Sequence, residues 1–227
     1  MAVEAAQDEA LLAVQFHETW RPTVADLDLR KRMGNSFATH SFHIIRIALR
    51  REVLLTLMRL WDRDSRTVKL TAIAEFLRDN TLFDALVCQR ARNLGHSVDV
   101  TDNMREALEP KRNEILRLVR KYTDSNEHAS VLDRLRILRH EQLAHRQAHK
   151  PTDPAALRHS DEEVEEFYQD TLEIVRLMLS VFLATTFDIA EDGGKVYRHH
   201  ADFFWAAACG ECTEGHPRYR RPASRVG

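Results

Sequence analysis

The sequence predicts an all-α fold. Glycine and proline are scarce, with 7 and 6 among 227 residues, whereas leucine, alanine, arginine and glutamate are plentiful, and this balance favours helices over strands. Apolar residues also recur at helical spacing along long stretches of the chain. We therefore expect a helical bundle of roughly four to five principal helices with N- and C-terminal extensions.

The first helix is expected from about Val3 to Trp20. It ends before Pro22, because a proline disfavours the helical conformation of the residue that precedes it, here Arg21. A polar linker that contains a glycine then runs to about Ser36.

The stretch from Phe37 to Asp62 is the most strongly helical part of the chain. It carries two apolar stripes, and a helix that is apolar on nearly two faces is expected at the centre of a bundle. One stripe consists of Ile44, Ile47, Ala48, Arg51, Leu55, Met58 and Trp61, and the other of Ile45, Leu49, Val53, Leu57 and Leu60.

Three further helices are expected in the middle of the chain. The stretch Leu70–Leu94 predicts two of them, with a break near Asp79-Asn80 and an end at Gly95, because glycine is a favoured C-cap residue. The third begins at Thr101-Asp102-Asn103 and contains Pro110.

Two capping-box patterns mark the last two expected helices, because a polar N-cap followed three residues later by glutamate satisfies free backbone donors. Asp124 with Glu127 begins a helix that runs through residue 138 into the segment 138–146 and ends in the proline-containing loop 147–157. Ser160 with Glu163 begins a long amphipathic helix, which we expect to end at Asp192-Gly193-Gly194.

These elements divide the chain into three parts. We expect an N-terminal helix and linker (1–36), a helical bundle (37–189) and a partly flexible C-terminal extension (190–227). The extension contains a short aromatic segment at 201–208 and an arginine-rich tail that we expect to be poorly ordered.

Charge and hydropathy exclude several classes of protein. A formal charge of -2 excludes a globally basic nucleic-acid binder, so any RNA contact must come from a local patch. The N-terminus is acidic where a secretory signal needs basic residues. The longest apolar segment, 174–187, is interrupted by Arg176 and is shorter than the roughly 20 residues that span a bilayer. We therefore expect a cytoplasmic protein without a membrane anchor.

The string Arg139-His140-Glu141-Gln142-Leu143-Ala144-His145 combines one arginine with two histidines. Near neutral pH a histidine can take the proton of a ribose 2′-hydroxyl or give one to the departing 5′-oxygen, while an arginine stabilises the charge on the phosphate. On a straight helix Arg139 and His145 lie about 120° apart around the axis and about 9 Å apart along it. Either the helix ends between them, or a second copy of the chain completes the site across a two-fold axis, which we favour.

These residues resemble a known family. The string from Arg139 to His145 is similar to the Arg-φ-x-x-x-x-His motif of the HEPN superfamily (higher eukaryotes and prokaryotes nucleotide-binding domains), in which φ is commonly Asn, Asp or His. The segment Leu57–Leu77, which includes Leu60-Trp61-Asp62-Arg63, resembles the Leu-Trp-Asp-Arg segment of the abortive-infection AbiU-like branch. The resemblance covers about residues 37–189.

The resemblance implies a helical bundle that dimerises and, as in many HEPN proteins, a metal-independent endoribonuclease. By position, Arg139 and His145 would be the catalytic pair and His140 would support them. We therefore expect a homodimeric RNA-cleaving protein of toxin or phage-defence type, with an antitoxin as a candidate partner. Other HEPN proteins are non-catalytic dimerisation or nucleotide-binding modules, and this is the alternative.

Asp62 and Arg146 are further candidates for the site. Trp61-Asp62-Arg63 is either a core tryptophan followed by a surface ion pair, or a segment in which Asp62 or Arg63 orients the motif histidines. Arg146, together with Arg134, Arg136 and Arg139, either supplies a basic patch for RNA or belongs to a solvated helix face.

The C-terminal extension contains half of a zinc-site pattern, Cys209-x-x-Cys212-x-x-x-His216, preceded by His199-His200. A structural zinc site has four ligands, so the fourth would have to come from the paired histidines or another chain. We interpret Cys209 and Cys212 as incidental thiols, keep them with His216 as weak zinc candidates, and expect neither a metal nor another cofactor.

Overall fold

The computed structural model describes residues 2–34, 38–62, 69–93, 99–124, 127–139 and 160–208. Across these ranges the chain forms helices and no strand, so the all-α prediction is confirmed. The helices are α1 (Ala2–Trp20), α2 (Pro22–Ala25), α3 (Leu27–Met33), α4 (Thr39–Leu60), α5 (Leu70–Arg78), α6 (Asn80–Asn93), α7 (Asp99–Thr123), α8 (Glu127–Leu138), α9 (Asp161–Leu183), a π-helical turn (Ile189–Gly193) and α10 (Gly194–Ala208). None of the described helices is both long enough and apolar enough to cross a membrane.

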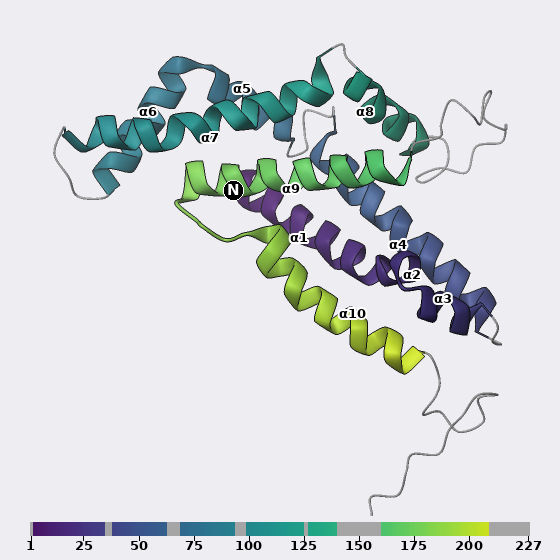
Figure 1. Ribbon diagram of the computed structural model, residues 1–227. Helices are drawn as coiled ribbons and strands as arrows, with labels where there is room; N and C mark the ends of the chain where they lie inside the picture. The colour runs from purple at the N-terminus through teal and green to yellow at the C-terminus, as the bar shows by residue number, and fades with distance from the viewer. Residues whose placement is uncertain are drawn as a thin grey trace, which may run out of the picture.

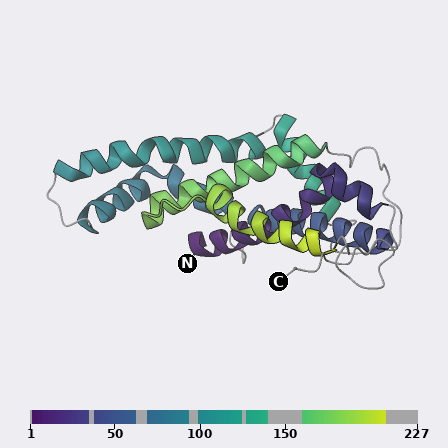
Figure 2. The same ribbon diagram turned by 60° about the horizontal axis from the view of Figure 1, so that its bottom comes forward.

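The helices form two groups that α9 joins. α7 packs against α5, α6, α8 and α9, whereas α1 packs against α4, α9 and α10. In Figure 1, α7 and α9 cross the upper part of the molecule, and α1, α4 and α10 run obliquely below them. Figure 2 shows α9 again between α7 on one side and α1 and α10 on the other.

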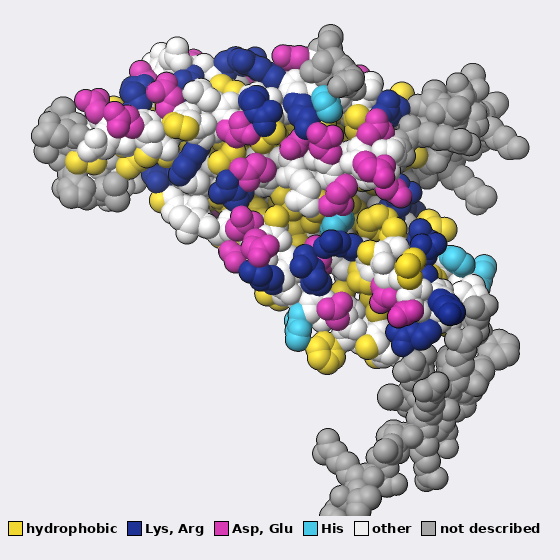
Figure 3. Space-filling model, viewed as in Figure 1, with side chains coloured by type: hydrophobic (Ala, Val, Ile, Leu, Met, Phe, Trp, Pro, Cys, Tyr) yellow, Lys and Arg dark blue, Asp and Glu magenta, His cyan; other side chains and the backbone are white. Residues whose placement is uncertain are grey.

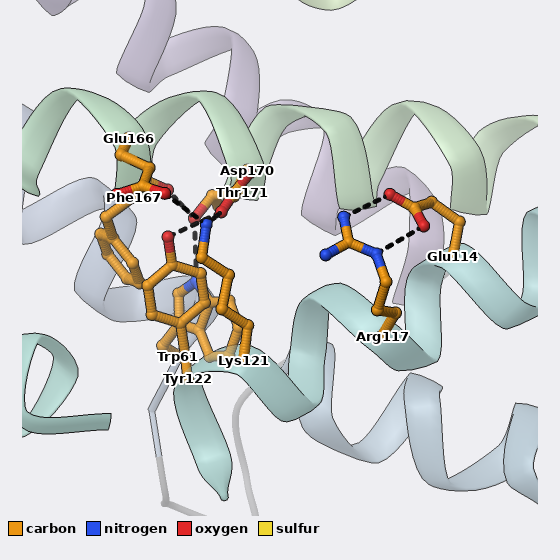
Figure 4. Close-up of polar contacts among 9 residues, drawn as sticks. All are labelled: Trp61, Glu114, Arg117, Lys121, Tyr122, Glu166, Phe167, Asp170 and Thr171. Carbon is orange, nitrogen blue, oxygen red and sulfur yellow. Dashed lines mark hydrogen bonds and ion pairs between the residues drawn. The ribbon is translucent and has the colours of Figure 1, made fainter. Parts of the chain in front are cut away.

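Trp61, immediately after α4, is fully buried in the main core. Its indole Nε1 donates a hydrogen bond of 3.0 Å to Thr171 Oγ1 on α9. Its ring packs edge-on against Tyr122 of α7 and at a tilt against Phe167 of α9, with centroid distances of 5.6 and 5.5 Å (Figure 4). Three helices therefore meet at one side chain, and the prediction that Trp61 is a core residue is confirmed.

The position predicted for α4 is correct for only half of this helix. Its C-terminal half is buried through Val53, Leu57 and other residues, whereas Ile44 and Ile47 are 55% and 68% exposed. The N-terminal half instead turns Phe42 towards α3 and α10, in a second apolar cluster that also contains Trp205. Ile45 of the second stripe is also exposed, at 38%, so both stripes keep exposed members in this half and the prediction of a central helix is wrong there.

The start of α9 is as predicted, and its end is not. Both hydrogen bonds of the Ser160–Glu163 capping box are present, at 2.9 and 3.1 Å. The helix ends at Leu183, because Ala184 adopts a left-handed conformation with φ of 57°. The predicted end at Asp192-Gly193-Gly194 is therefore wrong, and the chain from Gly194 to Ala208 forms α10 where only a short aromatic segment was expected.

The chain between α1 and α4 also differs from the expected linker. Asp26 accepts a hydrogen bond of 2.8 Å from the backbone N–H of Leu29 and so begins α3. The predicted break near Asp79 is confirmed, and it separates α5 from α6. Buried Arg112 of α7 closes this break by donating to the carbonyl oxygen of Leu77 at 2.6 Å.

The bond between Trp61 and Thr171 predicts a stability difference. Thr171→Val keeps the side-chain shape but leaves the buried indole N–H without its acceptor, so the free energy of unfolding should fall by about 1–3 kcal/mol. Urea denaturation measures this change. Thr19→Val is the matched control, because the Thr19 hydroxyl donates only to Gln15 O of its own helix. Equal losses in the two variants would contradict the importance of the Trp61 bond.

Candidate functional site

The first residue of the arginine-histidine motif lies beside the residue that follows Trp61. Arg139 is at the end of α8, and its Nη1 donates to Asp62 Oδ2 at 2.9 Å. The two side chains keep 26% and 20% of their surface exposed. The structure thus brings together two of the predicted site residues, which are far apart in the sequence.

Several of the predicted site residues lie outside the described residues. They are His140, His145, Arg146, Cys209, Cys212 and His216. Arg63, the second candidate for orienting the histidines, also lies outside them. Their roles, and the zinc-site pattern, stay predictions.

The neighbouring arginines of α8 are held by carboxylates. Arg136 bonds Asp133 at 2.9 Å and also donates to the carbonyl oxygen of Trp61 at 3.3 Å. Arg134 bonds Glu163 of α9 at 2.6 Å. On the face drawn in Figure 3, positive and negative side chains are interspersed. These contacts favour an ion-paired surface over a continuous basic patch in the described part of α8.

Within the described residues, the bond to Asp62 uses only part of the hydrogen-bonding capacity of the Arg139 guanidinium. A guanidinium has five N–H donors, and one of them is used on Asp62. Its planar fork matches the oxygens of a phosphate, which makes it suited to hold a phosphodiester. Within the described residues, no group of three or more His, Cys, Asp and Glu side chains is arranged to hold a metal ion.

A cavity of about 320 Å³ lies next to the pair. It lies where the ends of α4 and α7 meet the start of α5 and the side of α8. It is lined by Asp62, Lys69, Thr71, Tyr122, Thr123, Ala129, Asp133 and Arg136. Lys69 and Thr71 were not among the predicted site residues, although both follow closely after the Trp61-Asp62-Arg63 segment.

Tyr122, which lines this cavity, is held in its neutral form. Burial raises the pKa of its hydroxyl, and a hydrogen bond of 2.7 Å donated to Asp170 raises it further. Lys121 bonds the same carboxylate and Glu166, both at 2.6 Å (Figure 4). Tyr122 is therefore a structural residue of the cavity wall and not a general base near neutral pH.

A second cluster of titratable groups surrounds His17 of α1. Its ring stacks on Tyr168 at 4.0 Å, and Nε2 lies 2.9 Å from Glu165 Oε2 of α9. On the other side, Nδ1 lies 3.5 Å from Glu18, which accepts a bond of 2.9 Å from Arg198 of α10. The cluster joins α1 to α9 and α10. The sequence carries no local signal for it, because its partners are distant in the chain.

Burial and charge act in opposite directions on the pKa values of this cluster. Burial would lower the pKa of His17, but the carboxylates of Glu165 and Glu18 outweigh it and raise the pKa above 6.5. Burial would raise the pKa of Glu18, but His17 and Arg198 hold it at about 2. Both groups are therefore charged in mildly acidic solution.

Comparison with known protein families places the chain in a family. The family described as AbiU2, a HEPN family, matches residues 2–204. This range includes α1 and most of α10, and so extends beyond residues 37–189 at both ends. No curated protein and no solved structure matches the chain.

Glu18 predicts how stability depends on pH. Its pKa in the folded chain is about 2 against an ordinary 4.5, so its contribution is present above about pH 4.5 and is lost as the pH falls towards 2. The shift corresponds to about 3 kcal/mol. His17 stays protonated throughout this window, because its pKa is raised.

We expect Glu18→Gln to flatten the fall in unfolding free energy between about pH 5 and pH 3, measured by urea denaturation. The exposed Glu106→Gln is the control and should keep the slope of the unsubstituted protein. Parallel slopes for Glu18→Gln and the unsubstituted protein would show that Glu18 does not carry this dependence.

Proposed function

The chain belongs to the AbiU2 family of HEPN proteins, and from this premise we propose that it is a metal-independent endoribonuclease of toxin or phage-defence type. The observation that carries the proposal is the 2.9 Å bond between Arg139 and Asp62. It joins the first residue of the Arg-φ-x-x-x-x-His motif to the Leu-Trp-Asp-Arg segment. An antitoxin that restrains the activity is part of the same proposal.

The proposed reaction is an attack by the ribose 2′-oxygen on the adjacent phosphorus. The bond from phosphorus to the 5′-oxygen of the next nucleotide breaks, and the products are a 2′,3′-cyclic phosphate and a 5′-hydroxyl. His145 takes the proton of the 2′-hydroxyl or gives one to the departing oxygen, and His140 orients it or shares the transfer. Arg139 stabilises the pentavalent phosphate.

Asp62 is proposed as a positioning residue for Arg139. A long arginine side chain has many rotamers, and a carboxylate that binds one nitrogen removes most of this freedom before the substrate arrives. Asp62 is itself fixed, because it follows fully buried Trp61. The guanidinium of Arg139 would therefore already be oriented when a phosphate arrives.

We also propose that the active form is a homodimer that uses the exposed face of α4. Ile44 and Ile47 form an exposed apolar patch there, and such patches commonly mark protein interfaces. Ile47 and Asp62 are about 22 Å apart along the helix, so an antiparallel pairing centred on Ile47 would hold the two sites about 44 Å apart. A shared site therefore requires the two α4 helices to run in the same direction, with the two-fold axis parallel to them.

The nuclease proposal predicts cleavage of RNA in the presence of EDTA. Arg139→Ala and His145→Ala should each lower the cleavage rate about 100-fold or more, because each removes a group that acts on the transition state. Cleavage is measured on a labelled RNA by gel electrophoresis, with the cyclic phosphate identified by mass spectrometry. Arg117→Ala is the matched control, because Arg117 pairs with Glu114 on the exposed side of α7 (Figure 4).

Undiminished cleavage by the Arg139/His145 double variant would overturn this assignment. If RNA stays intact when it is incubated with the unsubstituted protein, the result would favour the non-catalytic HEPN alternative. Expression separates the two further, because a nuclease toxin should arrest growth and its motif variants should not.

The dimer proposal predicts that Ile47→Glu is monomeric. A carboxylate buried in an apolar interface carries a large desolvation cost, so the dimer should dissociate at micromolar concentrations. Light scattering after size-exclusion chromatography measures the mass. Val196→Glu is the control, because Val196 is 52% exposed on α10 and outside the proposed face. A dimer that survives Ile47→Glu, or an unsubstituted protein that is monomeric, would contradict this interface.

A further inference from the structure

The cavity beside Asp62 is lined by two carboxylates, those of Asp62 and Asp133, and by two cations, Lys69 and Arg136. Of its four charged lining residues, Asp62 pairs with Arg139 and Asp133 with Arg136, each at 2.9 Å. Lys69 forms no hydrogen bond or ion pair with the described part of the chain. Within the described residues, the partly buried ammonium group of Lys69 is therefore the cation of the cavity that is open to an anion.

The size of the cavity exceeds that of a simple anion. About 320 Å³ lies at the lower end of the roughly 300–1,000 Å³ of small-molecule sites. A phosphate ion alone would leave most of this space to water. The ligand that fits therefore carries a phosphate together with a larger polar group.

The remaining lining residues match the other parts of a nucleotide. The hydroxyl of Thr71 forms no bond within the described residues, and that of Thr123 donates to Val119 O at 3.0 Å and keeps its lone pairs. Carboxylate oxygens of Asp62 and Asp133 can accept from ribose hydroxyls or from amino groups of a base. Tyr122 is only 2% exposed and forms the wall of the cavity beside these polar groups.

We propose that this cavity binds one nucleotide of the RNA substrate, with Lys69 at its phosphate. The inference rests on the proposed ribonuclease function and names the part of the substrate that the site holds. Asp62 lines the cavity and also bonds Arg139. A nucleotide seated there presents the next phosphodiester of the strand to Arg139, so binding in the cavity sets which bond is cut.

The test measures binding to a short single-stranded 2′-O-methyl RNA, which cannot undergo attack by a 2′-hydroxyl. Fluorescence anisotropy gives its Kd for the full chain, and competition by the four nucleoside 5′-monophosphates and by inorganic phosphate identifies the bound group. We expect monophosphates to compete at least tenfold better than phosphate. Lys69→Gln should raise the Kd for RNA about tenfold and lower the slope of log Kd against log salt by about 0.7, as expected for one lost phosphate contact on a single strand.

Two further variants keep this test decisive. Thr71→Val preserves the shape of the cavity wall without changing charge, and should weaken nucleotide competition at least threefold at an unchanged salt slope. Lys195→Gln removes an exposed charge on α10, where Lys195 bonds Glu191, and should leave binding unchanged. Circular dichroism melts show whether each variant is folded.

The outcomes separate this inference from the function on which it rests. If RNA binding depends on Lys69 but the protein cuts no RNA, the proposed nucleotide site is supported and the nuclease proposal is overturned. If cleavage needs Arg139 but neither Lys69→Gln nor Thr71→Val changes RNA binding, the proposed nucleotide site in the cavity is overturned and the nuclease proposal is not. The proposed nucleotide site is also overturned if inorganic phosphate competes as well as the nucleotides do, or if the nucleotides bind without displacing RNA.

Discussion

The burial of Trp61 is the constraint on which the rest of the molecule depends. Its indole is hydrogen-bonded to Thr171 and packed between aromatic rings from α7 and α9. A buried aromatic side chain of this size contributes more than any single surface contact, and its N–H needs a partner inside the core. The end of α4 is therefore fixed against two other helices, and the residue that follows it has a defined position.

This fixed end allows two distant segments to form one site. Arg136 binds the carbonyl oxygen of Trp61, and Arg139, one helical turn later, binds Asp62. α8 is thus attached to the end of α4 by two contacts on the same side. The motif arginine and the Leu-Trp-Asp-Arg segment are physically coupled, which gives a structural reason for their joint occurrence in the chain.

Much of the fold could be predicted from local signals, because helix ends depend on nearby residues. Ser160 and Glu163 form the predicted box, and the break at Asp79 is present. The end of α9 was not predictable from residue type, because Ala184, a strong helix former, adopts the left-handed conformation there. In the site, Arg139 and Asp62 were identifiable from motifs. Lys69 was not, because it joins Asp62 only in a cavity that tertiary packing creates.

The pairing of Arg139 with Asp62 has a consequence for how RNA would approach the protein. The two opposite charges cancel at a distance, so the pair generates little field beyond the roughly 8 Å over which charges act at physiological ionic strength. The guanidinium would then contribute little to diffusional steering of the proposed RNA substrate, and the encounter would proceed at an ordinary association rate. Under the proposed function, discrimination between nucleic acids would then fall to the dissociation step, after the strand has already touched the surface.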